Sequence, residues 1–366
     1  MTPHFVPLLL LFVASGLTSF VATGIVKGGA VRIGLVDEPG DRKHHRVATP
    51  RLGGLAIIFG FGFPLLILAA DARAAELVTK NLQYLFAVLS SGSLILGLGI
   101  YDDLLGANAP KKFIVQTAAA IILVSFGFKF DYVSFGGSVV NLGVLGWVAS
   151  VLWIVGVINA LNFIDGIDSL ATVVSITIAV SFGIIAILRY DIFSLVIMVA
   201  LAGSLIGFYP WNKPPAKIFM GDSGSLFIGL LLAACSIARP SKSPTALIIG
   251  GPMLALALPV IDTLFVMRAR IAGKHSSWRT RLSAVFTADR NHIHHILIGK
   301  YGSIAKVIFG IWSVTLLFAI AAVMTVLPTT KPIGYAAAVL ALLVLVVMRF
   351  RQRRPTDEEI AESLRA

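Results

Sequence analysis

The chain has 366 residues, of which 57% are hydrophobic and only 13% are charged, and its formal net charge is +12 at pH 7. Soluble globular domains carry about 25% charged residues, so this composition excludes an ordinary soluble protein and indicates a membrane protein. One cysteine, Cys235, lies in an apolar segment, which excludes an intramolecular disulfide and favours a packing role for the thiol.

Apolar runs of about 20 residues recur along the chain, and each is long enough to cross the hydrocarbon core of a bilayer. They predict an all-α polytopic membrane protein with about eleven transmembrane helices: 5–26, 52–70, 82–101, 113–128, 142–158, 170–188, 192–209, 223–238, 245–267, 303–326 and 333–349. The first run has no basic residues before it, so we expect a retained helix rather than a cleaved signal peptide. We expect one transmembrane domain over 1–350 and a polar cytoplasmic tail over 351–366.

The basic residues predict the orientation of these helices. When the polar segments are assigned alternately to two sides, one side holds 23 of the 30 basic residues and the other holds Arg73, Lys80, Lys129, Arg189, Arg239, Lys242 and Lys331. The side rich in Lys and Arg is the cytoplasmic one. We therefore expect the N-terminus outside and the C-terminus in the cytoplasm. The positive charge is explained by topology and by attraction to anionic lipid, and nucleic acid is not an expected partner.

Five aspartates stand at the ends of apolar segments, and all five fall on the predicted cytoplasmic side: Asp102, Asp103, Asp165, Asp168 and Asp222. Ionisable groups at membrane depth are costly and are candidates for functional sites. Carboxylates that cluster without matching Cys or His ligands suit a hard divalent cation such as Mg²⁺. This combination predicts chemistry on a phosphate at a membrane surface.

The first two aspartates end the third predicted helix in the sequence GIYDDLLGANAPKKFIVQ. Adjacent carboxylates repel each other, and a metal ion or a basic neighbour relieves that repulsion. Lys112, which opens the fourth helix, could pair with Asp102 and Asp103 or with a phosphate group. Without such a partner, the pair would be a solvated polar end to a helix, which is common.

Polar residues recur every third position in INALNFIDGIDSLA, at Asn159, Asn162, Asp165 and Asp168. Neighbouring members of such a series share one face of a helix, and Gly166 allows the helix to break. These side chains could read the base or ribose of a nucleotide, or help to hold a metal. Helix capping by Asp168 or Ser169 explains only one of the four.

Asp222 lies among small residues in KIFMGDSGSLFIG, at the start of the eighth predicted helix. The N-terminus of a helix favours an anion, and glycine lets a phosphate or a metal approach the backbone. The pattern is not a Walker A motif. Small residues also serve helix packing in membranes, but packing does not explain Asp222.

The long cytoplasmic loop ends in DRNHIHH, which contributes Arg290, His292, His294 and His295. Arg and His donors suit a nucleotide diphosphate, whereas a zinc site lacks the thiolates or carboxylates that would complete it. Asp262 lies near the cytoplasmic end of the ninth predicted helix, where it could pair with Arg268 or Arg270 or face a cavity.

These clusters resemble, in order, the motifs of the polyprenyl-phosphate N-acetylhexosamine-1-phosphate transferases of glycosyltransferase family 4. The resemblance runs from about Gly34 to His295 and includes GLVDEPGDRKHHRVATPRLGGLAI, YDDLLG with KKFIVQ, NALNFIDGIDSLA, FMGDSGSLFIG and DRNHIHH. The first loop and HIHH are similar to the branch that transfers GlcNAc-1-phosphate. The branch acting on UDP-MurNAc-pentapeptide usually has three consecutive histidines, and Ile293 interrupts them here.

The resemblance implies a reaction and a set of partners. A UDP-N-acetylhexosamine, most simply UDP-GlcNAc, would donate its sugar-1-phosphate to undecaprenyl phosphate and release UMP. This would be the first membrane step of a cell-envelope polysaccharide such as O-antigen, lipopolysaccharide or teichoic acid. The implied cofactor is Mg²⁺, with Mn²⁺ as an alternative metal. The implied location is the bacterial inner membrane, with a cytoplasmic active site, and a homodimer is left open.

The resemblance also implies roles for individual residues. Asp222, supported by Asp103, matches the metal ligand, and Asp102 matches the base or nucleophile beside the carrier phosphate. Lys112 matches a phosphate-binding lysine, and Asp165, His294 and His295 match other catalytic positions. The remaining matches bind the nucleotide: Asn159, Asn162, Asp168, Arg290 and His292.

Two other functions remain as alternatives at this stage. The chain could be a phospho-MurNAc-pentapeptide transferase, or a secondary transporter that uses its carboxylates as ion sites. A transporter would place those carboxylates near the middle of the membrane and would show inverted repeats. The aspartates lie at cytoplasmic ends instead, and no such repeat is evident.

Overall fold

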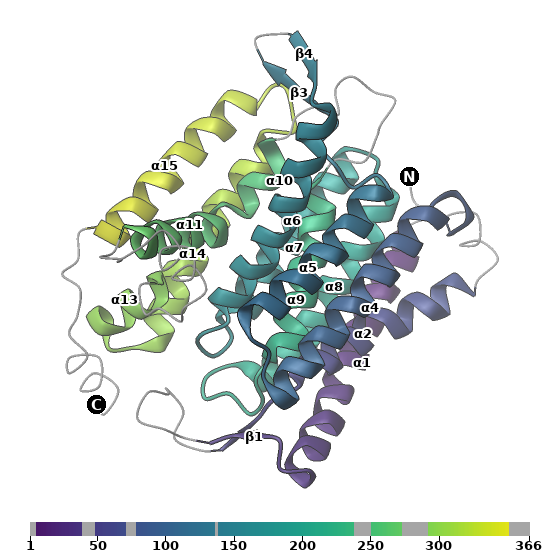
Figure 1. Cartoon of the computed structure of the whole chain (residues 1–366), viewed down its shortest axis with the longest axis vertical. Helices are drawn as coiled ribbons and strands as arrows, with labels where there is room; N and C mark the ends of the chain where they lie inside the picture. The colour runs from purple at the N-terminus through teal and green to yellow at the C-terminus, as the bar shows by residue number, and fades with distance from the viewer. Residues whose placement is uncertain are drawn as a thin grey trace.

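Long apolar segments form helices in the computed structural model, which describes residues 5–38, 48–70, 78–135, 138–237, 250–272 and 292–350. The helices lie side by side along most of the molecule (Figure 1). Their bounds are α1 Phe5–Arg32, α2 Gly53–Ala69, α4 Leu82–Leu105, α5 Ala109–Ser125, α6 Gly143–Ile164, α7 Leu170–Leu188, α8 Ile192–Asn212, α9 Gly221–Ser236, α10 Gly250–Ala255, α11 Ala257–Ile271, α13 Ile293–Tyr301, α14 Ile304–Met324 and α15 Lys331–Phe350.

Seven of these helices are long and apolar enough to cross a membrane, and α2 and α9 are shorter apolar helices. These counts apply to the residues that the structure describes. They confirm the predicted all-α polytopic membrane protein, while the total of eleven spans and the orientation stay predictions. The division between domain and tail at residue 350 is also untested, because 351–366 lie outside the described residues.

The ninth predicted span differs from the structure in its continuity. The described part of 245–267 is divided at Leu256, where α10 ends and α11 begins. Pro259 lies in the first turn of α11 and has no N–H to donate to the carbonyl four residues earlier, at Ala255. The hydrogen-bond ladder is therefore interrupted at this point.

In the part of the chain that the structure describes, two small antiparallel strand pairs supplement the helices. β1 (Val36–Asp37) pairs with β2 (Thr49–Pro50), and β3 (Tyr132–Phe135) pairs with β4 (Ser138–Asn141). The β3–β4 hairpin lies at the top of the molecule and β1 lies at the bottom (Figure 1). The two strand pairs therefore mark opposite ends of the helical bundle.

Glycines let other helices approach α9 closely. A Cβ added at Gly54 of α2 would lie 2.1 Å from the nitrogen of Gly224, and one at Gly99 of α4 would lie 2.4 Å from the Cα of Ser223. On α9 itself, a Cβ at Gly229 would lie 2.8 Å from the Cα of Ile158 in α6. Small residues permit such close backbone packing in membrane proteins. The N-terminus of α9 is therefore fixed against α2 and α4.

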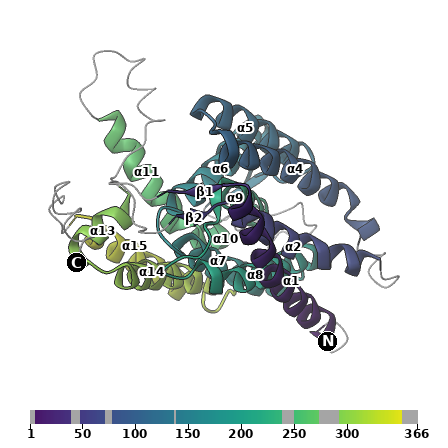
Figure 2. The same ribbon diagram turned by 90° about the horizontal axis from the view of Figure 1, so that it is seen from below.

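The last helices form a second group beside this core. Seen from below, α13, α14 and α15 lie together on one side of the molecule, and α1, α2 and α4 lie on the other (Figure 2). α13 contacts α14, and α14 contacts α15, α7 and α10. The histidines at the start of α13 therefore belong to a different group of helices from the aspartates of α4 and α9.

Candidate active site

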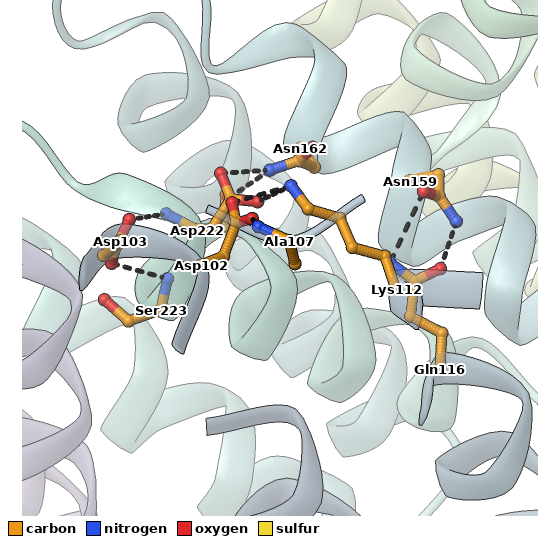
Figure 3. A network of polar contacts seen from close by, with 10 residues as sticks. Asp102, Asp103, Ala107, Lys112, Gln116, Asn159, Asn162, Asp222 and Ser223 are labelled. Carbon is orange, nitrogen blue, oxygen red and sulfur yellow. Dashed lines mark hydrogen bonds and ion pairs between the residues drawn. The ribbon is translucent and has the colours of Figure 1, made fainter. Parts of the chain in front are cut away.

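Lys112 joins two of the predicted carboxylates at the lower end of the bundle. Its Nζ lies 2.7 Å from Oδ2 of Asp102 and 2.6 Å from Oδ2 of Asp222. Figure 3 shows the lysine reaching from α5 towards the last turn of α4 and the first turn of α9. Asp102 also accepts the backbone N–H of Ala107 at 2.5 Å, which fixes its carboxylate within the turn after α4.

Asp103 binds the start of α9 rather than Lys112. Its two oxygens accept the backbone N–H groups of Asp222 at 2.8 Å and Ser223 at 3.1 Å, and the residue is only 9% exposed (Figure 3). A carboxylate at this position satisfies two unpaired donors of the helix. Gly221 has φ +72, and a Cβ there would lie 2.7 Å from both oxygens of Asp103. Asp103 therefore orients Asp222 within the predicted site.

The asparagines of α6 have separate partners. Asn162 Nδ2 donates to Asp222 Oδ1 at 3.0 Å and to Ser225 Oγ at 2.9 Å. Asn159 Nδ2 donates to Gln116 Oε1 at 2.7 Å, and Gln116 is buried. Asn162 therefore orients the carboxylate of Asp222, whereas Asn159 joins α6 to α5 away from it (Figure 3).

The turn between α6 and α7 carries Asp165 and Asp168. The Asp168 carboxylate accepts the backbone N–H of Ala216 at 2.8 Å and so holds the segment that leads to α9. Among the described residues, no hydrogen bond or ion pair occupies the Asp165 carboxylate. Burial, followed by the negative charges of Asp222, Asp103 and Asp168, raises the pKa of Asp165 well above its ordinary value. A cation or a protonated partner would be favoured beside this group.

The aspartates surround one cavity of about 360 Å³. Its lining includes all five predicted aspartates, His295, and the ion-paired Asp37 and Arg51, which lie in the loop between α1 and α2. Backbone hydrogen bonds hold that loop against the start of α9, since Phe219 N–H donates to Pro50 O at 2.9 Å and Gly53 N–H donates to Phe219 O at 2.9 Å. The cavity is therefore lined by segments far apart in the sequence.

The histidines approach the cavity from α13. His295 lines it, and the buried His294 lies against the backbone of Gly166, where an added Cβ would be 2.4 Å from His294 Nε2. His292 lies farther back, with Nδ1 2.8 Å from Oδ2 of Asp262. Of the predicted basic and histidine residues in this segment, Arg290 lies outside the described residues.

The carboxylates suit a hard divalent cation such as Mg²⁺, because they supply oxygen ligands on one cavity wall. Within the described ranges no group of three or more His, Cys, Asp and Glu side chains is arranged to hold a metal ion. Mg²⁺ is often bound by one or two carboxylates together with water and substrate phosphates, so a complete set of protein ligands is not required. The residues present fit that kind of site.

Sequence reasoning missed several members of this arrangement. Gln116 is the last residue of KKFIVQ, and no pattern in the sequence indicates that its buried amide pairs with Asn159. Asp37 and Arg51 belong to the first-loop motif and line the cavity, but the motif alone does not indicate a function for either side chain. The sequence indicates a helix break at Gly166, but the contact of Gly166 with His294 spans 128 positions, and a single sequence does not display such a contact.

Comparison with known proteins identifies the family of this chain. The family model described as glycosyl transferase family 4 matches residues 85–239, which contain the aspartates of α4, the α6–α7 turn and α9. The probable undecaprenyl-phosphate N-acetylglucosaminyl 1-phosphate transferase of Bacillus subtilis is 34% identical over 314 residues, covering 85% of this chain and 83% of the relative.

Two further relatives have related names. The decaprenyl-phosphate N-acetylglucosaminephosphotransferase of Mycolicibacterium smegmatis is 31% identical over 391 residues, covering 95% of this chain and 90% of its own length. The phospho-N-acetylmuramoyl-pentapeptide-transferase of Streptococcus pneumoniae is 33% identical, over 57% of this chain and 66% of the relative. The chain therefore belongs to the polyprenyl-phosphate N-acetylhexosamine-1-phosphate transferases of glycosyl transferase family 4, and it is a multi-pass membrane enzyme of the phosphoglycosyl transferase class.

Proposed function

We propose that this enzyme transfers GlcNAc-1-phosphate from UDP-GlcNAc to undecaprenyl phosphate and releases UMP. The observation that carries the proposal is the placement of Lys112 between Asp102 and Asp222 at a cavity lined by carboxylates. The relatives that cover most of this chain are named as transferases of N-acetylglucosamine phosphate to undecaprenyl or decaprenyl phosphate. Their names support the sugar and the acceptor class.

The reaction brings two anionic substrates together. An oxygen of the lipid phosphate attacks the phosphorus that carries the sugar. The bond from this phosphorus to the oxygen that bridges the two phosphorus atoms of the donor breaks. UMP leaves with that bridging oxygen. Lys112 would receive a phosphate oxygen, since its ammonium is held by Asp102 and Asp222, which both line the cavity. Fixed positive charge at the site of developing negative charge is a large source of catalysis.

We further propose that Mg²⁺ is held chiefly by Asp165 and Asp222. The oxygens of Asp103 accept two backbone N–H groups, and Asp102 accepts hydrogen bonds from Lys112 and Ala107. Asp165 faces the negative charges of its neighbours and has no hydrogen-bond partner among the described residues. When bound, the metal would neutralise phosphate charge and orient the leaving group. Asp103 then contributes by fixing the start of α9, which refines the metal-supporting role first expected for it.

Direct attack is the simpler of the two mechanisms that the residues allow, because the lipid phosphate is already an anionic nucleophile. Asp102 would then hold Lys112 and the acceptor in place rather than form a covalent intermediate. The alternative begins with attack by the Asp102 carboxylate on the donor, which releases UMP before the lipid binds. Incubation with UDP-GlcNAc alone distinguishes them, since only the covalent route releases UMP without lipid and leaves GlcNAc-1-phosphate bound through its phosphorus to the Asp102 carboxylate.

The proposed orientation has the N-terminus outside, the C-terminus in the cytoplasm and the cavity on the cytoplasmic face of a bacterial inner membrane. The distribution of Lys and Arg supports it. Single cysteines introduced at Lys111 and in the β3–β4 hairpin at Tyr132 would test it, in a background where Cys235 is replaced by Ser. A membrane-impermeant thiol reagent applied to intact cells should label only position 132.

The donor is tested by a panel of UDP-sugars with undecaprenyl phosphate and Mg²⁺, scored for UMP. UDP-GlcNAc should support the fastest release, ahead of UDP-GalNAc and of UDP-MurNAc-pentapeptide. Faster release from UDP-MurNAc-pentapeptide would favour the function named for the Streptococcus pneumoniae relative. Family membership already sets aside the secondary transporter.

A further inference from the structure

Asp262 is a buried carboxylate that the proposed reaction does not use. It is 2% exposed and lies on α11, which packs against α6 of the core and against α14. Three groups from two segments contact it: His292 Nδ1 at 2.8 Å, the backbone N–H of Ile293 at 3.0 Å and Arg349 Nη1 at 2.5 Å. Burying a carboxylate with three partners costs far less free energy than burying an isolated one. Removing the carboxylate would leave all three partners without their acceptor.

The contact with Ile293 places Asp262 at the N-terminus of α13. His292 is the residue before this helix, and its own side chain makes no capping hydrogen bond. Asp262 supplies the missing acceptor from 31 positions earlier in the chain. A carboxylate at a helix N-terminus satisfies a free donor and matches the helix dipole. The start of α13, and with it the direction of His294 and His295, is therefore set from α11.

Arg349 links the same carboxylate to the last helix. It lies in the final turn of α15, is 9% exposed at its side chain, and its guanidinium also lies 4.9 Å from the ring of Phe265 on α11. Phe265 in turn meets Phe350 edge to face at 5.5 Å. In Figure 1 the end of α15 lies beside α11. These contacts join the end of the last membrane helix to α11.

The path from this cluster to the cavity is short. The His292 ring lies 5.2 Å from the ring of Phe163 on α6 and 5.9 Å from that of His294. His294 rests on Gly166, between the two cavity aspartates Asp165 and Asp168, and its ring is 4.2 Å from that of His295, which lines the cavity. A shift of α13 would therefore displace His295 and press on the Asp165 turn.

We propose that Asp262 and Arg349 are positioning residues that hold the histidine segment, His292 to His295, against the active-site cavity. The last membrane helix thus takes part in catalysis, although it contributes no group to the cavity lining. The inference rests on the proposed function for its kinetic readout. It goes beyond that function by assigning a task to two buried charges that lie away from the phosphate-binding groups.

The test compares Arg349→Gln and Arg349→Lys with Lys331→Gln, a control at the other end of α15. We expect Arg349→Gln to lower kcat by about 10- to 100-fold, because small misplacements of catalytic groups have effects of this size. The KM for undecaprenyl phosphate should change by less than about twofold, since Lys112 and Asp102 are untouched. Arg349→Lys should recover part of the loss, because it restores a charged donor for Asp262.

A second readout does not depend on turnover. Diethyl pyrocarbonate modifies accessible histidines, and His294 is 1% exposed in the intact protein. Peptide mass spectrometry should find His294 protected in the wild type and in Lys331→Gln, and modified several times faster in Arg349→Gln. If Arg349→Gln does not fold, Asp262→Asn carries the same comparison, since it keeps an acceptor oxygen for the Ile293 N–H.

Wild-type kcat together with wild-type protection of His294 in a folded Arg349→Gln enzyme would overturn the inference. An equal loss in Arg349→Lys and Arg349→Gln, with a raised KM for the lipid, would also contradict it. If the wild type releases no UMP from any UDP-sugar, the proposed function fails, while the protection of His294 still tests the positioning role.

Discussion

The ammonium of Lys112 lies 2.6 Å from the carboxylate of Asp222, although 110 residues separate them in the chain. One residue comes from the first turn of α5 and the other from the first turn of α9. The contact requires α4 to lie between these helices, because Asp102 binds the same ammonium and Asp103 binds the start of α9. The adjacent aspartates thus have different tasks: Asp102 holds the lysine and Asp103 holds the helix.

Replacing Lys112 by Met should abolish most of the activity. Removal of the ammonium withdraws the charge that would receive a phosphate oxygen and leaves Asp102 and Asp222 facing each other, so we expect kcat to fall by about 10²- to 10³-fold. Lys111→Met is a matched control, because the exposed Lys111 lies over the ring of Tyr101 and not in the cavity. UMP release by the two purified variants checks the prediction. Similar rates for both would remove Lys112 from the mechanism.

Gly221→Ala should destabilise the start of α9. An alanine at φ +72 costs about 1–2 kcal/mol, and its Cβ would lie 2.7 Å from the Asp103 oxygens that cap the helix. Gly97→Ala is the control, since a Cβ at that position on α4 meets no atom within 4 Å. Thermal unfolding in detergent should show a lower Tm for Gly221→Ala alone. Equal Tm values for both variants would argue against the described cap.

Asp165→Asn should inactivate the enzyme and stabilise the metal-free protein at neutral pH. The raised pKa means that the folded state binds more protons than the unfolded state between the ordinary pKa of 3.8 and the folded one. The group therefore lowers the free energy of unfolding as pH rises through that interval. The Asn variant does not lose stability in this way. In EDTA its Tm should therefore exceed that of the wild type at neutral pH, and this difference should shrink towards acid pH.

Two comparisons make the Asp165 result specific. Asp131→Asn is the control, because Asp131 forms a partly exposed ion pair with Lys129, and such pairs contribute little to stability. Mg²⁺ should raise the Tm of the wild type and of Asp131→Asn, since a ligand that binds only the folded state stabilises it. An equal rise in Asp165→Asn would exclude Asp165 as a metal ligand.

Gly166→Ala should lower turnover by displacing His294. The added Cβ would lie 2.4 Å from Nε2 and 3.0 Å from Cε1 of the ring, which is buried and has little room to move. A displacement of about 1 Å at a catalytic group can cost about 100-fold in rate. Gly156→Ala on α6 is the control, because no atom lies within 4 Å of the added Cβ. Unchanged kcat in Gly166→Ala would show that the contact has no catalytic consequence.

The sequence predicted the apolar helices well because each apolar run has the length of a membrane span. It placed their ends less well. The predicted spans stop at residues 101 and 158, where polar residues begin, whereas α4 continues to Leu105 and α6 to Ile164. A helix ends where the backbone turns, as at Gly106 with φ +75, and not where its side chains become polar. Asp102, Asp103, Asn159 and Asn162 are helical for this reason.

Membership of the site was predictable from residue type, but the pairing within it was not. All five aspartates line one cavity, as their placement at helix ends indicated. The separate partners of Asp102 and Asp103 depend on the direction in which each side chain leaves the last turn of α4, and adjacent helical residues point about 100° apart. The bond between Asp262 and Arg349 joins α11 to α15, and no local pattern specifies such a long-range contact.

The decisive measurement is UMP release from UDP-GlcNAc by the purified wild type and by Asp222→Asn, each with and without undecaprenyl phosphate in the presence of Mg²⁺. We expect the wild type to release one UMP for each lipid-linked sugar diphosphate formed, only when the lipid is present, and folded Asp222→Asn to release almost none. Lipid-independent release by the wild type, or near-normal release by Asp222→Asn, would contradict the proposed reaction.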